Sequence, residues 1–61
     1  MTATLIIAAE LATRRKHWIA GVPTPADIDA TVTHLAHRLK LPREEVRTVV
    51  RAELAALRIA I

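Results

Sequence analysis

The chain has 61 residues and a formal net charge of +3, and 52% of its residues are apolar although Trp18 is its only aromatic residue. This length allows one small domain, and the lack of cysteine excludes disulfide staples and thiolate metal sites. A domain of this size buries only about 60% of the surface that its unfolded chain exposes. We therefore expect a single domain over residues 1–61, supplemented by close helix packing or by self-association.

A first helix is expected from about residue 3 to residue 20. Thr2 is available as its N-cap, and Gly21 followed by Val22 and Pro23 is typical of a helix that ends at a left-handed glycine. The positions expected to face inward are Leu5, Ile7, Ala8, Leu11, Ala12, Trp18 and Ile19.

A second helix is expected from about residue 25 to residue 40. Thr24 and Asp27 have the spacing of a capping box, and Pro25 falls at the first helical position, where the missing amide hydrogen costs nothing. Its apolar residues recur every three or four positions, so they lie on one stripe. They are Ile28, Val32, Leu35 and Leu39.

Pro42 begins a third helix, expected over about residues 42–60, because proline disfavours a helical conformation in the residue before it. The stripe of this helix comprises Val46, Val50, Leu54, Leu57 and Ile61, with Val49 at its edge. Two amphipathic helices joined so closely must pack against each other, because neither buries its stripe alone. The fold class is therefore all-α, a three-helix bundle.

Small residues cover the side of the third helix that faces away from this stripe. One interpretation is the seam of a homodimer, which would relieve the thin core. The other is that alanine is simply a good helix former on an exposed face. The candidate interface residues are Ala52, Ala55, Ala56 and Ile59.

The junction of the second and third helices has a recognisable pattern. Ala36 is a small residue in the middle of a helix, and apolar residues surround the turn and anchor the next helix; these are Leu35, Leu39, Leu41, Val46 and Val49. Over residues 32–51 this arrangement resembles the helix-turn-helix of small bacterial and phage DNA-binding regulators. Lys40 stands where that family usually has glycine, and a lysine at positive φ costs on the order of 1 kcal/mol.

The resemblance implies that the third helix reads DNA. It assigns DNA contacts to Arg43, Glu44, Arg47, Thr48 and Arg51, and the basic run Arg14, Arg15 and Lys16 is expected to contact flanking phosphates. Arginine can donate two hydrogen bonds to guanine or to phosphate, whereas the lack of Asn and Gln excludes reading adenine through a side-chain amide. Arg47, Arg51 and Arg58 form one stripe with few carboxylate partners on the same helix: Glu44 can reach Arg47, and Arg51 has none. This stripe suggests an anionic partner, and the alternative is a solvated basic face.

Other classes of function find little support. His34 and His37 are one turn apart and His17 lies in another helix, which is not a zinc ligand set, so we expect no metal and no cofactor. Ser, Cys and Tyr are absent, and so short a chain hardly builds a water-excluding pocket, so we expect no enzyme. The apolar opening, residues 3–9, is too short to span a membrane, and we expect a cytoplasmic protein.

The leading hypothesis is a small DNA-binding transcriptional regulator, acting as a homodimer, with the third helix as recognition helix. The alternative is a helical protein–protein interaction module, namely a docking domain, an antitoxin-like protein or a phage-encoded inhibitor. The alanine-rich face, Lys40, and the repulsion of phosphate by Glu44 and Glu45 favour this alternative. A steep salt dependence of binding to duplex DNA would favour the first.

Overall fold

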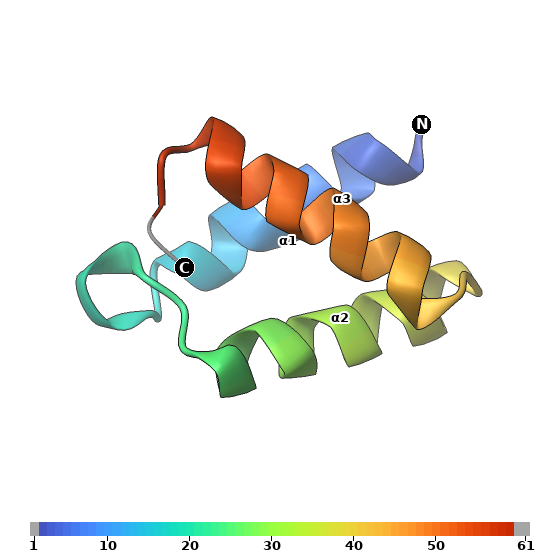
Figure 1. Ribbon diagram of the computed structural model, residues 1–61, viewed down its shortest axis with the longest axis horizontal. Coiled ribbons are helices and arrows are strands. Elements are labelled where there is room, and N and C mark those ends of the chain that lie inside the picture. Colours follow the sequence, from blue (N-terminus) through green and yellow to red (C-terminus); the bar gives the residue numbers. More distant parts are fainter. Residues whose placement is uncertain (1, 60–61) are drawn as a thin grey trace.

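The computed structural model describes residues 2–59, in the order α1 (Ala3–Arg15), a short 3-10 helix η1 (Ile19–Gly21), α2 (Pro25–Leu39) and α3 (Arg43–Ala56). As predicted, the protein is an all-α three-helix bundle, and residues 2–59 contain no strand. Figure 1 shows that α1 and α3 run in the same general direction, while α2 returns the opposite way. No helix within residues 2–59 is both long enough and apolar enough to cross a membrane.

The core lies where the three helices meet, and each helix contributes residues spaced by about one turn. Its buried apolar members are Ile7, Leu11, Ile28, Val32, Leu35, Ala36, Val46, Val50, Leu54 and Ile59. Thr31 is also buried, and its hydroxyl donates to the Asp27 carbonyl oxygen at 2.8 Å, which satisfies the polar atom inside the core. Trp18, Leu39, Leu41 and Val49 are partly buried against this cluster.

The first helix begins where predicted but ends earlier. The Thr2 hydroxyl accepts a hydrogen bond from the Leu5 amide at 3.3 Å, which confirms the N-cap. α1 stops at Arg15 rather than near residue 20, because the His17 and Trp18 amides bond three residues back and end the helix in a tight turn. Trp18 has an extended backbone and still packs on the core. Leu5 was expected inward but is 60% exposed, since it lies two residues before Ile7 and thus roughly 200° around the helix.

The segment that follows α1 also differs from its prediction. Gly21 has a positive φ of 71°, as expected, but it closes η1 instead of the first helix. Ala20, with φ 55°, is left-handed as well, so the chain reverses over two residues. This reversal turns Ile19 outward, where it is 87% exposed rather than facing the core.

The start of α2 confirms the predicted capping box. The Thr24 hydroxyl accepts from the Asp27 amide at 3.1 Å, and the Asp27 carboxylate accepts from the Thr24 amide at 2.9 Å. Pro25 occupies the first turn as expected. Two of the amide groups that a helix start leaves without partners are therefore satisfied by neighbouring side chains.

The third helix ends at Ala56, and two residues beyond it do not lie where they were predicted. Arg58 is left-handed, with φ 58°, and the Ile59 amide donates to the Leu54 carbonyl oxygen at 3.0 Å. This closing turn brings Ile59 back onto Leu54, so Ile59 is buried rather than on the outward face. Leu57, expected in the core, is 45% exposed. Ile61, also predicted in the core, lies outside the described residues.

Candidate nucleic-acid interface

The turn between α2 and α3 sets the position of the candidate site. It occupies residues 40–42, and Lys40 is left-handed, with φ 56° and ψ 45°. The Lys40 and Leu41 amides both donate to the Ala36 carbonyl oxygen, Leu41 at 3.1 Å. These bonds satisfy the end of α2 and offset the strain of a lysine at positive φ, which is on the order of 1 kcal/mol. The turn therefore holds α3 close to the end of α2.

The predicted DNA-contacting residues of α3 do not share one environment. Glu44, Thr48 and Arg51 are exposed on the sides of α3 away from the buried Val46 and its stripe. Arg43 lies on the same side as Val46, three residues before it, and is exposed because it is the first residue of the helix. The Thr48 hydroxyl donates to the Glu44 carbonyl oxygen at 2.9 Å, so only its lone pairs remain for a ligand. The exposed group thus combines two arginines with one carboxylate and one hydroxyl.

Arg47 is the exception, because it is held by α2. Its Nη1 lies 2.9 Å from Oδ1 of Asp29, in an ion pair whose side chains are 26% and 59% exposed respectively. The spacing within the third helix offered Arg47 only Glu44 as a local carboxylate partner, but the structure pairs Arg47 with Asp29. The partner comes from another helix, 18 residues away along the chain, so no helical spacing within α3 indicates it.

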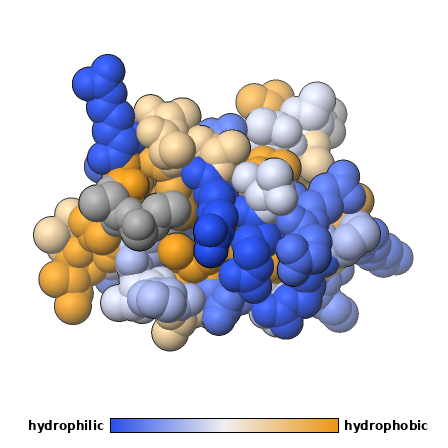
Figure 2. Space-filling view, viewed as in Figure 1, coloured by the Kyte–Doolittle hydropathy of each residue, from blue (hydrophilic) through white to orange (hydrophobic). Residues whose placement is uncertain are grey.

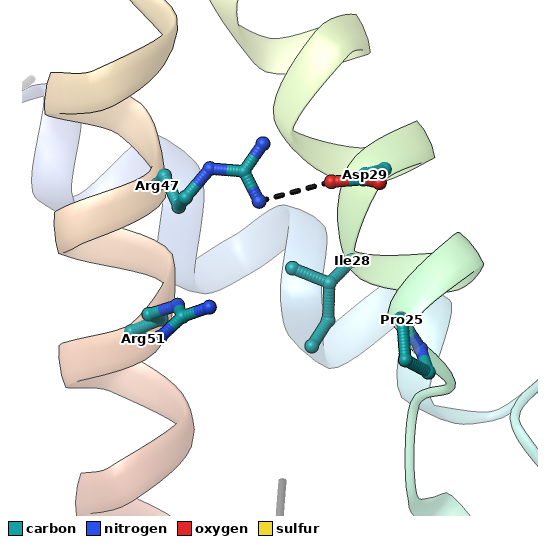
Figure 3. A pocket seen from close by; sticks show the side chains of 5 residues that line it. All are labelled: Pro25, Ile28, Asp29, Arg47 and Arg51. Atoms are coloured by element: carbon teal, nitrogen blue, oxygen red, sulfur yellow. Dashed lines mark hydrogen bonds and ion pairs between the residues drawn. The ribbon is translucent and has the colours of Figure 1, made fainter.

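A cleft of about 350 Å³ separates the first half of α2 from α3. Its lining residues are Pro25, Ile28, Asp29, Arg47 and Arg51 (Figure 3). Figure 3 shows the Arg47 guanidinium reaching across to α2 while Arg51 lies one turn further along α3. Within residues 2–59 Arg51 makes no ion pair, so two guanidinium groups face a single carboxylate. The cleft is thus positive at its rim and apolar at Ile28.

The basic run of α1 lies elsewhere. Arg14 is paired with Glu10 at 2.7 Å, and the same carboxylate lies 3.6 Å from Arg38 of α2. Arg15 and Lys16 are exposed. The end of α1 stands at the opposite end of the bundle from the α2–α3 turn (Figure 1). The fold therefore brings Arg47 and Arg51 together but keeps the basic run apart from Arg43.

Of the four predicted dimer residues, three are exposed and one is buried. Ala52, Ala55 and Ala56 are exposed along α3, whereas Ile59 is buried in the core of its own chain. Larger apolar side chains are exposed in the α1–α2 connection, where Val22 is 39% accessible. Figure 2 shows apolar side chains gathered at that end of the molecule and hydrophilic ones over the middle of the same face.

The histidines do not form a metal site. His17, His34 and His37 are all exposed, and no group of three or more His, Asp or Glu side chains within residues 2–59 is placed to hold a metal ion. The chain matches no protein-family model, and no curated protein and no solved structure matches it. The case for a function therefore depends on the geometry of α2 and α3.

Proposed function

We propose that the protein is a small DNA-binding transcriptional regulator that uses α3 as its recognition helix and works as a homodimer. The observation that carries the proposal is the placement of Thr48 and Arg51 on the exposed side of a helix that a tight, left-handed turn holds against α2, with Arg43 exposed at the start of that helix. The left-handed Lys40 stands where the helix-turn-helix family usually has glycine. Such a role would place the protein in the cytoplasm.

The chemistry of this surface suits duplex DNA. α3 has 14 residues and so is about 21 Å long, and the major groove of B-form DNA is about 12 Å wide, enough to admit a helix. Arg43 and Arg51 would bind guanine edges or phosphates, and the exposed Arg15 and Lys16 would contact phosphates farther along the duplex. Glu44 would disfavour phosphate at its own position and so restrict the ways in which α3 can lie.

The homodimer is proposed at the exposed alanines of α3, Ala52, Ala55 and Ala56, without Ile59. Small side chains allow two helices to approach closely, and a two-fold dimer would supplement the thin core of a chain of 61 residues. Sedimentation of the free protein tests this part separately. A dimer at micromolar concentration that Ala55→Arg dissociates is expected, and a monomer at high micromolar concentration contradicts it.

The test of DNA binding compares two variants by fluorescence anisotropy with a labelled duplex. Arg43→Ala combined with Arg51→Ala should weaken binding at least tenfold at low salt and lower the salt slope by about 0.9 for each phosphate that the variant no longer neutralises. Arg58→Ala removes the same kind of charge beyond the end of α3 and should have a smaller effect. Unchanged affinity of the double variant, with helicity retained by circular dichroism, would contradict the proposal.

A second candidate function is a helical protein-interaction module. The exposure of Ile19, Val22 and Leu57 favours it, because large apolar side chains that stay accessible are typical of surfaces that contact other proteins. Ile19→Asp separates the two candidates. It should leave DNA binding unchanged under the first proposal, whereas it should abolish stoichiometric, DNA-insensitive capture of a protein partner under the second.

A further inference from the structure

The ion pair between Arg47 and Asp29 links the two helices that border the cleft. Arg47 projects from α3, Asp29 projects from α2, and one hydrogen bond of 2.9 Å joins Nη1 to Oδ1 (Figure 3). A guanidinium has five donors, and a phosphate or carboxylate can engage two of them at once. Asp29 therefore occupies only part of the anion-binding capacity of Arg47.

The pair is accessible enough to be exchanged. The Asp29 side chain is 59% exposed and that of Arg47 is 26% exposed, and ion pairs that water reaches contribute little net stability because water and salt screen them. A buried pair would behave differently, since removing one partner would leave an uncompensated charge in the interior. An incoming anion can thus replace the carboxylate without opening the core.

The rest of the cleft offers what a phosphate would need after such an exchange. Arg51 lies beside Arg47 and has no ion-pair partner within residues 2–59. Without the carboxylate, two guanidinium groups one turn apart on α3 would face the same cleft, and Ile28 and Pro25 would give its inner side an apolar surface. The cleft thus offers two guanidinium groups to an anion, and the Asp29 carboxylate already engages one of them.

We propose that Asp29 is an intramolecular competitor of DNA: it holds Arg47 against α2, and a backbone phosphate must displace it before Arg47 and Arg51 bind DNA together. This inference rests on the proposed function and adds a residue of α2 that lowers the affinity. The exchange weakens every phosphate contact made through Arg47, whatever the DNA sequence. Asp29 therefore reduces non-specific binding, and contacts made by other residues of α3 are left to select the site.

Asp29 could instead help DNA binding by positioning Arg47. That role predicts the opposite change in DNA affinity when Asp29 is replaced, so the experiment distinguishes the two. A carboxylate that positioned Arg47 for DNA would have to remain bonded to it in the complex. Removing it would then weaken binding, because the arginine would lose its orientation. The competitor predicts a gain in affinity from the same substitution.

The experiment measures duplex binding by Asp29→Asn at low salt. We expect the affinity to rise about two- to fivefold, the range that corresponds to an exposed ion pair. Glu53→Gln removes an equal charge from the second half of α3, beyond the residues assigned to DNA and without an ion pair in the described part of the chain, and should produce a smaller gain. In a protein that also carries Arg47→Gln, Asp29→Asn should raise the affinity for the duplex by no more than this control does.

The outcomes separate the inference from the proposed function. If the wild-type protein binds DNA and Asp29→Asn binds equally or more weakly, the inference is overturned and the proposed function stands. A gain that persists undiminished in the Arg47→Gln background also overturns it, because the effect would then be one of net charge. If neither the wild-type protein nor Asp29→Asn binds duplex DNA at low salt, with both folded by amide spectra, the proposed function fails and the inference fails with it.

Discussion

The connection between α2 and α3 spans residues 40–42, whereas the connection between α1 and α2 spans residues 16–24. The short connection is closed by hydrogen bonds to the Ala36 carbonyl oxygen, and Leu39 and Leu41 on its two sides are partly buried on the core. The long connection packs Trp18 on the core but exposes Ile19 and Val22. The short connection therefore fixes the position of α3 relative to α2, and with it the cleft that Arg47 and Arg51 line.

The end of α3 repeats the device of the short connection. Lys40 and Arg58 are both left-handed residues that follow a helix, and each is followed by an apolar residue whose amide bonds back to the helix. Both are long cations, which interact favourably with the negative end of a helix. A basic residue followed by an aliphatic one thus closes two helices of this chain, a task more often given to glycine.

The largest expected effect tests whether a partly buried residue of the short connection contributes more to stability than an exposed residue of the long connection. Leu41→Ala, in the short connection, should lower the free energy of unfolding by about 1–3 kcal/mol, because Leu41 is partly buried against the core. Ile19→Ala, in the long connection, should change it by less than about 0.5 kcal/mol. Urea denaturation measures both. Equal losses from the two substitutions would remove the distinction between the connections.

A smaller effect tests how the long connection is anchored at its end. Thr24→Ala should cost about 1 kcal/mol, since the Asp27 amide loses the hydroxyl oxygen that accepts from it. Thr33→Ala, at an exposed position inside α2, is the matched control and should be neutral or slightly stabilising. Thermal unfolding of the two variants distinguishes them. A Thr24→Ala protein as stable as the control would show that the Thr24 hydroxyl contributes no stability as a helix cap.

The smallest effect concerns the strain at Lys40. Lys40→Gly should raise the stability by roughly 0.5 kcal/mol, because relief of the strain at positive φ exceeds the extra entropy of glycine in the unfolded chain. His34→Gly, in the helical interior of α2, should instead lower it by a similar amount. A loss in both variants, seen by urea denaturation, would mean that the left-handed turn stores no strain.

Local chemistry is what the sequence predicted well. The capping box at Thr24, the N-cap at Thr2 and the helix start after Pro42 each depend on a few neighbouring residues, and the structure has all three. The buried stripes of α2 and of the first part of α3 follow from spacing alone, for the same reason. The all-α bundle was therefore within reach of sequence reasoning.

Contacts between distant residues were missed. Asp29 pairs with Arg47 because the bundle places the first half of α2 beside α3, and Glu10 bridges Arg14 and Arg38 from two helices. Neither the Asp29–Arg47 pair nor the Glu10–Arg38 pair is set by spacing along one helix. Chain reversals were missed as well: the turn at Ala20 and Gly21 exposes Ile19, and the turn at Arg58 buries Ile59. Both involve a non-glycine residue at positive φ, for which the sequence gives only a weak signal.

The measurement that tests DNA binding by α3 most directly is a titration of ¹⁵N-labelled protein with a mixed-sequence DNA duplex at low and at physiological salt, followed by backbone amide shifts. We predict shifts centred on residues 43–51 of α3, extending to Asp29 in α2, that fade as salt rises. A folded spectrum that does not change at low salt, or shifts confined to the α1–α2 connection, would contradict this prediction.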